Sequence, residues 1–259
     1  MTKIPGTQAI DRALAVLKCF ANGKRSVRVS DIARMLDINP STAHRMIRVL
    51  IENGFLQQDA ATSEYYLGPT TLILGQIAQR NLGLNEAMAV LERVGRETGE
   101  SANIGIPDDA AALVILRVES EHPLRFDQSP GTRVPLHCTA MGKSMLAFRR
   151  DFEINALGKL EAKTAKTITD PGMLAEELDE VRRRGFSTDD EESIEGVRCV
   201  GAPILGQSGY AVAAIAVQAP SVRMAESRIA ELGGRLIEAA AEISETGFHW
   251  LAKNGEAWK

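Results

Sequence analysis

The sequence predicts an α+β protein in which a small winged helix-turn-helix precedes a larger domain with an antiparallel sheet. Two short helical patterns separated by a tight turn occupy residues 29–53, and two strand-like segments follow within residues 55–67. Beyond residue 84, short apolar strands come in small groups with a helical pattern at either end, which is typical of α+β domains. A chain of 259 residues is long enough for two hydrophobic cores.

The second helix of the pair carries the most informative pattern. Asn39 suits the N-cap, and Pro40 suits the first helical position, where an N–H has no helical partner. At about 100° per residue, one side of this helix is apolar and is expected to dock on the preceding helix; it comprises Ala43, Met46, Ile47 and Leu50. The opposite side suits phosphates and guanine edges; it comprises Ser41, His44, Arg45, Arg48 and Glu52, with Thr42 on its flank.

The first helix of the pair is expected to begin at Ser30, the candidate N-cap, and to turn an apolar side inward through Ile32, Ala33 and Leu36. Asp37 occupies a turn position where glycine is commoner, and aspartate tolerates the left-handed conformation better than most residues. The order of helix, turn and helix places a short helix in the major groove of DNA. We expect DNA contacts from Ser30, Ser41, Thr42, His44, Arg45 and Arg48, with the two arginines as the main ones.

The flanking segments complete this module. Residues 7–21 form an amphipathic pattern that is expected to close a three-helix core through Ile10, Leu14, Leu17 and Phe20. After a helix stop at Asn53-Gly54, residues 55–67 predict a hairpin, the wing, with a polar loop suited to phosphates. An ordinary small helical domain with a solvated polar face is the alternative, and the ordered succession of all four elements disfavours it.

The charge distribution favours DNA contact by the N-terminal part. Residues 1–80 hold 10 lysines and arginines against 6 acidic residues, whereas residues 81–259 hold 20 against 28. A basic module on an acidic remainder is expected when one end of a protein meets DNA. No apolar run is long enough to span a membrane. The three cysteines, Cys19, Cys138 and Cys199, show no metal or disulfide spacing, which favours a reducing cytoplasm.

The expected domains are residues 1–68 for the DNA-binding module, 69–82 for a linker helix, 83–249 for the C-terminal domain and 250–259 for a tail. The linker helix is apolar along residues 72–78, and this surface is expected to be buried either on a partner or on the C-terminal domain. In the C-terminal domain we expect helices at 84–98, 139–149, 170–184 and 221–244, and strands at 102–106, 112–118, 133–137, 186–188, 197–204 and 211–217.

The C-terminal domain lacks familiar enzyme motifs. HCTAMGKS has His137 where a phosphate-binding loop needs glycine, and Gly206–Gly209 lacks the spacing of a nucleophile elbow. The four histidines show no metal-ligand spacing, so neither a cofactor nor a metal site is expected. Two regions suit a small molecule: a helix start near Thr139, whose N–H groups suit a carboxylate, and the acidic segment 189–192, which by itself favours a solvated loop.

Together these segments resemble the isocitrate-lyase-regulator (IclR-type) family of bacterial transcription factors along nearly the whole chain. The N-terminal marks are GTQAIDRALAVLKCFA, DIARMLDINPSTAHRMIRVLIENGFL and YYLGPTTLILG, and the later ones are PLHCTAMGKSMLA, GFSTDDEESIEGVRCVGAPI and AVAAIAVQAPSVRM. The resemblance implies a winged helix-turn-helix joined by a linker helix to a GAF-like effector-binding domain. It also implies dimers through the DNA-binding domains, commonly paired into tetramers, and a response to small organic acids.

The resemblance further implies an effector cavity, whose lining in this chain is Ala140, Met141, Asp189, Val197, Cys199, Ala216 and Gln218. The glyoxylate-sensing pattern carries serines where this chain has Ala216 and Gln218. Alanine lacks the hydroxyl, and the longer glutamine amide brings both donors and an acceptor. We therefore expect a larger ligand, an aromatic acid or a sugar acid, rather than glyoxylate.

The expected function is that of a metabolite-responsive transcriptional regulator, not an enzyme. It would bind a near-palindromic double-stranded DNA operator as a dimer or a dimer of dimers, and a small organic acid would change its affinity. Whether it is a repressor or an activator stays open. Two alternatives remain: an architectural DNA-binding protein without a ligand response, and a GAF-type thiol enzyme using Cys138 and Cys199, although a mid-strand thiol is normally inert.

Overall fold

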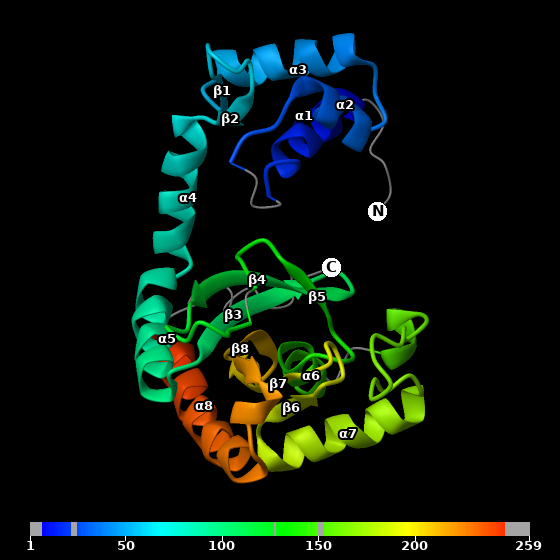
Figure 1. Ribbon diagram of the computed structural model, residues 1–259, viewed down its shortest axis with the longest axis vertical. Helices are drawn as coiled ribbons and strands as arrows, with labels where there is room; N and C mark the ends of the chain where they lie inside the picture. Colours follow the sequence, from blue (N-terminus) through cyan, green and yellow to red (C-terminus); the bar gives the residue numbers. More distant parts are fainter. Residues whose placement is uncertain (1–6, 22–24, 127, 150–152, 247–259) are drawn as a thin grey trace. The chain divides into compact units, whose positions relative to one another are not determined.

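The structure is a computed structural model that describes residues 7–21, 25–126, 128–149 and 153–246. The chain divides into two compact units, Met1–Gln79 and Arg80–Lys259. The first unit contains three helices, a two-stranded antiparallel wing and most of a fourth helix (Figure 1); they are α1 (Gln8–Lys18), α2 (Val29–Met35), α3 (Pro40–Glu52), β1 (Leu56–Gln58), β2 (Tyr65–Leu67) and α4 (Pro69–Asn81). The winged helix-turn-helix is thus confirmed, and the expected tail 250–259 lies outside the described residues.

The turn between α2 and α3 follows its predicted chemistry. Asp37 has a φ of 50°, the left-handed conformation expected of it. Asn39 is the N-cap residue of α3 and Pro40 is its first helical residue. The predicted cap of α2 is wrong, because α2 begins at Val29 with Arg28 at the cap position, and this leaves Ser30 inside the first turn.

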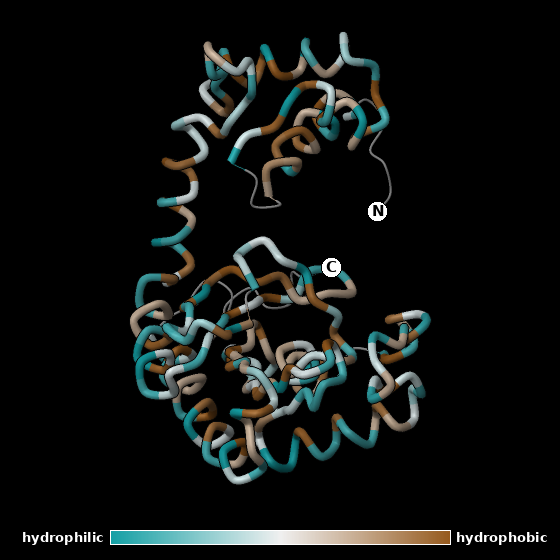
Figure 2. Tube along the Cα trace, in the orientation of Figure 1, coloured by the Kyte–Doolittle hydropathy of each residue, from teal (hydrophilic) through white to brown (hydrophobic). Residues whose placement is uncertain are grey.

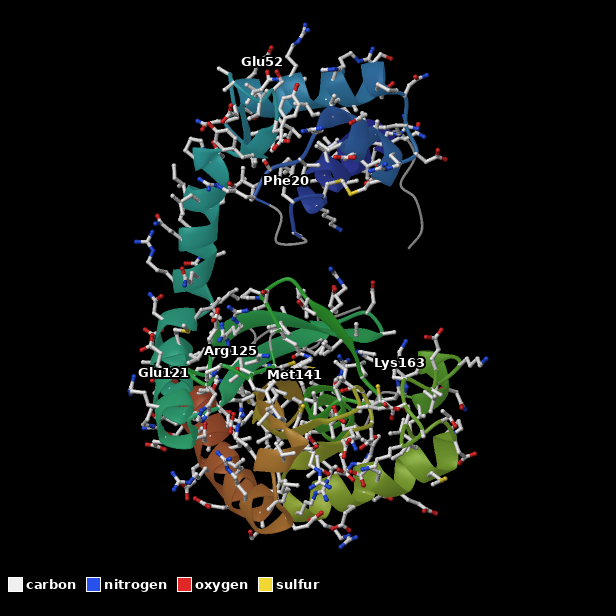
Figure 3. The ribbon with its side chains drawn as sticks, in the orientation of Figure 1. Phe20, Glu52, Glu121, Arg125, Met141 and Lys163 are labelled. Carbon is white, nitrogen blue, oxygen red and sulfur yellow. The ribbon has the colours of Figure 1, made fainter. Side chains whose placement is uncertain are left out.

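The core of the first unit confirms the inner sides of α2 and α3, but of the four residues predicted for the first helix it contains only Leu17 and Phe20. Phe20, labelled in Figure 3, is buried together with Val16, whereas Ile10 and Leu14 are 61% and 53% exposed. At 100° per residue, Val16 lies on a different side of α1 from Ile10 and Leu14, and Phe20 follows the end of the helix. The helix therefore has two apolar sides, and only one of them faces the core.

The wing is attached to the segment before α2, a connection that the sequence pattern did not indicate. Val27 and Tyr65 exchange both backbone hydrogen bonds at 2.9 Å. Glu64 accepts hydrogen bonds from Ser26 Oγ at 2.5 Å and from Arg28 Nε at 3.0 Å. These hydrogen bonds lower the pKa of Glu64, and the wing is thereby fixed beside the helix-turn-helix.

The second unit is an α+β domain built on one six-stranded sheet of order β5-β4-β3-β8-β7-β6, with every described pair antiparallel. Its helices are α5 (Leu84–Thr98), α6 (Ala140–Ala147), α7 (Pro171–Arg184) and α8 (Glu226–Thr246). Its strands are β3 (Ser101–Asp108), β4 (Ala111–Val118), β5 (Arg133–Pro135), β6 (Ser187–Asp190), β7 (Val197–Leu205) and β8 (Ala211–Pro220). No helix among the residues described has the length and apolar character that crossing a bilayer requires.

The elements predicted for this unit are present, with shifts at their ends and one additional turn. The last helix begins at Glu226, and a separate 3-10 turn occupies Ser221–Arg223. Asp189 and Asp190 belong to strand β6, where a loop was expected. A 3-10 turn at Ile154–Leu157 was not predicted.

The two faces of the sheet differ in character. One face packs against α5 and α8 through a continuous apolar layer that includes Ala102, Ile104, Val200, Ile215 and Val217. The opposite face carries small residues where α6 crosses it. A Cβ on Gly105 would lie 2.3 Å from Met141 Sδ, and a Cβ on Gly201 would lie 3.0 Å from the carbonyl of Ala140, so both glycines permit the close approach of α6.

The close packing of Gly142, within α6, leads to a testable prediction about stability. A Cβ there would lie 2.4 Å from the Cα and the carbonyl oxygen of Leu136, which are backbone atoms with little freedom to move. We expect Gly142→Ala to lower the free energy of unfolding by about 1–3 kcal/mol. The matched control is Gly234→Ala in α8, where a Cβ meets nothing within 4 Å. It should leave stability unchanged or raise it by about 0.5–1 kcal/mol, and equal effects in urea titrations would contradict this account.

Candidate functional site

Helix α3 has an apolar side and an opposite polar side, as predicted, and the polar side is exposed. Ala43, Ile47 and Leu50 are buried against the core of the first unit. On the other side, Ser41, His44, Arg45, Arg48 and Glu52 are exposed, and Thr42 is half-buried. Glu52 is labelled at the end of this helix in Figure 3. The side expected to meet DNA is therefore accessible within its unit.

The guanidinium groups of α3 differ from their neighbours in having no acidic partner within the described part of the chain. Arg34 on α2 pairs with Asp31 at 2.6 Å, and Arg28 pairs with Glu64 at 3.0 Å. Among the residues that the structure describes, no ion pair engages Arg45 or Arg48. Ser30 is exposed in the first turn of α2. Two free guanidiniums on an exposed helix are suited to phosphate oxygens and guanine edges.

The wing loop is ordered by its own side chains. Asp59 Oδ1 accepts the backbone N–H groups of Thr62 at 2.9 Å and Ala61 at 2.8 Å, and these hydrogen bonds lower the pKa of Asp59. The neighbouring Gln57 and Gln58 are exposed. The loop thus presents exposed polar groups, and Asp59 fixes the conformation of its backbone at residues 59–62.

Helix α4 leaves its apolar residues uncovered in the single chain. None of its residues is buried, and Leu72, Ile73, Leu74 and Ile77 are all exposed. Figure 2 shows hydrophobic stretches along this helix. Ile10 and Leu14 on α1 form a second exposed apolar surface in the same unit. Surfaces of this kind usually mark a site of protein association.

In the second unit, strand register gathers the predicted effector residues on one face of the sheet. Cys199 lies opposite Gln218 on β8 and opposite Asp189 on β6, and Asn103 on β3 lies opposite Ala216. Residues paired across an antiparallel ladder project to the same face. Asn103, Gln218, Cys199 and Asp189 therefore form a polar row across four strands, and all four are buried.

The start of α6 lies at this polar row. Ala140 packs with Val197 and Cys199, and Phe126 closes the same small apolar cluster. Thr139 is the N-cap of α6, and its Oγ1 accepts the N–H of Gly142 at 3.1 Å. The N–H groups of Ala140 and Met141 have no acceptor within the helix. Met141 is labelled in Figure 3. Asp189, Val197, Cys199, Gln218 and Ala140 are thus brought together, whereas the side chains of Met141 and Ala216 pack in a separate apolar cluster with Leu174 and Leu178 of α7.

Asp189 is buried, and its oxygens are already occupied. Its Oδ1 accepts the N–H groups of Glu192 at 2.7 Å and Ser193 at 3.2 Å, and its Oδ2 accepts Ser193 Oγ at 2.5 Å. Burial raises the pKa of Asp189, and these hydrogen bonds oppose that rise. The expectation of a solvated loop is wrong at Asp189 and Glu192, which are 1% and 7% exposed, because local N–H groups replace water around the carboxylate.

A buried ion-pair network lies beside this carboxylate, and sequence reasoning missed it. Lys143 Nζ, on α6, lies 2.6 Å from Glu192 Oε1 and 3.3 Å from Glu177 Oε1 on α7. Arg184 also contacts Glu177, at 3.1 Å. Burial raises the pKa of Glu192 to about 7, although Lys143 opposes the shift. A lone lysine within the apolar helix sequence AMGKSMLA was the available signal, because a buried lysine requires a partner.

The buried thiols have little chemical reactivity. Burial raises the pKa of Cys138 to about 12 and also raises that of Cys199 well above its ordinary value. A protonated thiol is a poor nucleophile, which argues against the thiol enzyme considered above. Within the described ranges, no three histidine, cysteine or carboxylate side chains are placed to hold a metal ion.

Comparisons with known proteins agree with both units. The profile described as "Bacterial transcriptional regulator IclR C-terminal" matches residues 77–245, and that of the "IclR helix-turn-helix domain" matches residues 9–60. The HTH-type transcriptional regulator BhcR of Paracoccus denitrificans is 37% identical over 92% of this chain and 87% of that protein. The transcriptional repressor IclR of Escherichia coli is 30% identical over 92% of this chain and 89% of that protein.

A solved structure of an IclR protein is also similar to this chain. Thermotoga maritima IclR is 30% identical, with a TM-score of 0.73 over 92% of this chain and 98% of that chain. The curated relatives are named as transcriptional regulators and repressors, so the protein is a regulator with a helix-turn-helix and an effector domain rather than an enzyme. The chain belongs to the IclR family of bacterial transcriptional regulators.

Proposed function

We propose that the protein binds a near-palindromic operator through α3 and that a small organic acid in the second unit changes its affinity. The observation that carries the DNA-binding half is the exposed side of α3, where neither Arg45 nor Arg48 pairs with an acidic residue among those described. Ser30, Ser41, Thr42 and His44 would add contacts to the phosphate backbone. Because the operator lies on the bacterial chromosome, the site of action is the cytoplasm.

The effector would lie between the start of α6 and the polar row. A carboxylate would accept the N–H groups of Ala140 and Met141, where the helix dipole also favours an anion. Cys199 and Val197 would line the apolar part, and Gln218 would contact the polar part. Gln218 and Ala216 favour an aromatic acid or a sugar acid over glyoxylate, because they replace two short hydroxyls with a longer amide and a methyl group.

A fluorescence anisotropy experiment tests this function. Duplexes selected from a random pool by the full-length protein would be titrated with and without a panel of organic acids. An effector coupling of about 1–3 kcal/mol would change operator affinity about 5- to 150-fold. Binding to the selected duplex with no response to any acid would instead support an architectural DNA-binding protein.

We also propose that α4 and the exposed side of α1 form the contact between subunits. Leu72 and Ile73 are 63% and 55% exposed in the single chain, and a symmetric dimer would set two recognition helices about one duplex turn apart. We expect Leu72→Glu with Ile73→Glu to shift the protein toward monomers in sedimentation velocity and to weaken operator binding. Ser227→Glu, an exposed change of charge on α8 and outside this surface, is the control and should do neither. An unchanged dimer in the double variant would reject this interface.

A further inference from the structure

Two buried amide side chains in the polar row each have one atom that no described residue contacts through a hydrogen bond. Asn103 is 0% exposed and Gln218 is 3% exposed. Among the described residues, nothing bonds Asn103 Oδ1 or Gln218 Nε2. The other end of the Asn103 amide is occupied, because Nδ2 donates to Gln128 Oε1 at 3.1 Å. Native proteins leave few buried polar atoms unpaired, so two such atoms close together call for an explanation.

The sheet register places the two amides beside each other. Asn103 lies opposite Ala216, and Gln218 is two residues further along the same strand, so the two side chains are diagonal neighbours on one face. Gln218 also lies opposite Cys199, which packs against Ala140 at the start of α6. Ala216, which lies opposite Asn103, also lies opposite Gly201, and a Cβ there would be 3.0 Å from Ala140. Both amides therefore lie on the face of the sheet that the start of α6 covers.

We infer that these two atoms hold a hydroxyl group of the effector and that the effector is a 2-hydroxy carboxylic acid. The inference rests on the proposed function. The hydroxyl donates its proton to Asn103 Oδ1 and accepts a hydrogen bond from Gln218 Nε2, while the adjacent carboxylate faces the N–H groups of Ala140 and Met141. The apolar cluster of Phe126 and Val197 contacts the carbon skeleton.

The pairing of one acceptor with one donor distinguishes a hydroxyl group from an oxo group and from an ammonium group. A 2-oxo group accepts from Gln218 but has no proton for Asn103, which leaves that buried oxygen unpaired. A 2-ammonium group donates to Asn103 but has no lone pair for Gln218. Rejection of an analogue that leaves a buried polar group unpaired is a strong source of specificity.

Isothermal titration of the full-length protein with matched pairs of acids tests the inference. The pairs are lactate with pyruvate, mandelate with phenylglyoxylate, and gluconate with 2-oxogluconate, so that each pair differs only at the carbon beside the carboxylate. In the pair that binds, the hydroxy acid should bind about tenfold or more tightly than the oxo acid. This comparison needs only the wild-type protein.

Variants then assign the effect to the two amides. Asn103→Leu should abolish the preference for the hydroxy acid, whereas Gln218→Leu should weaken both members of the pair, because both accept from Gln218. Asn85→Leu, an exposed change on α5, is the control and should alter neither affinity.

Equal affinities within a pair, or a preference that survives Asn103→Leu, would overturn the inference and leave the proposed function standing. Failure of every acid to bind would overturn both.

Discussion

Replacing Lys143 with methionine is expected to lower the free energy of unfolding by about 3–5 kcal/mol at pH 8, because it removes the cation from a buried ion-pair network. Lys143 is 1% exposed, and Glu192, at 2.6 Å, is nearly as inaccessible. Methionine fills a similar volume, so the main effect is the uncompensated carboxylate. Urea titration monitored by circular dichroism measures the loss.

The pH dependence of the stability lost in Lys143→Met identifies Glu192 as the group responsible. The pKa of Glu192 is raised to about 7 in the folded protein, so folding takes up a proton between the ordinary glutamate pKa and pH 7. The stability contribution of this group is therefore complete at low pH and declines as pH rises through that window. Without Lys143, which opposes the rise, the decline should extend to higher pH. The loss from Lys143→Met should accordingly be smaller at pH 5.5 than at pH 8.

The double variant Lys143→Met with Glu192→Gln provides the control. A neutral amide needs no cation, so it should recover much of the lost stability at pH 8 and flatten the pH dependence. A loss that is the same at both pH values, or that the second substitution does not reduce, would show that Lys143 acts through packing alone.

Replacing Arg45 and Arg48 together with alanine is expected to abolish most of the specific binding to the operator. Each residue that forms a bidentate contact with guanine contributes about 1–3 kcal/mol, so each single variant should bind roughly 5- to 150-fold more weakly. A residue that contacts phosphate would instead weaken binding to all sequences and reduce the slope of log affinity against log salt by about 1. Salt titrations of the two single variants therefore assign each arginine to a base or to the backbone.

Arg96→Ala is the matched control for these variants. Arg96 lies on α5 in the second unit, where its pairing with Glu92 at 3.9 Å is exposed. Its removal changes the net charge by the same amount as either α3 variant. Operator affinity that falls equally in Arg96→Ala and Arg45→Ala would reveal a general charge effect instead of a contact by α3.

The fold was largely predictable because its signals are local. Apolar spacing in α3, the cap at Asn39, the left-handed turn at Asp37 and the glycine after α7 all depend on residues within one or two helical turns. The error at Ile10 and Leu14 has the same origin. Helix α1 has two apolar sides, and which of them meets the core is decided by α2 and α3, not by the periodicity of α1 itself.

The effector site was less predictable because its residues meet through strand register and burial. Asp189, Cys199 and Gln218 followed from a family resemblance, and no spacing along the chain connects them. Asn103 was missed because its relation to Gln218 exists only once β3 pairs with β8. The burial of Asp189 and Glu192 depends on backbone N–H groups and on Lys143, so an acidic run that looks solvated in sequence becomes part of the interior.

Methylation protection of guanine N7 tests the central claim most directly, because N7 lies in the major groove, where α3 is proposed to bind. The full-length protein would be bound to duplexes that it selected from a random pool. We expect protected guanines in two half-sites about one helical turn apart, with one protection in each half-site lost in Arg45→Ala or Arg48→Ala. Full affinity with no N7 protection, or protection unchanged in the Arg45→Ala, Arg48→Ala double variant, would contradict the account.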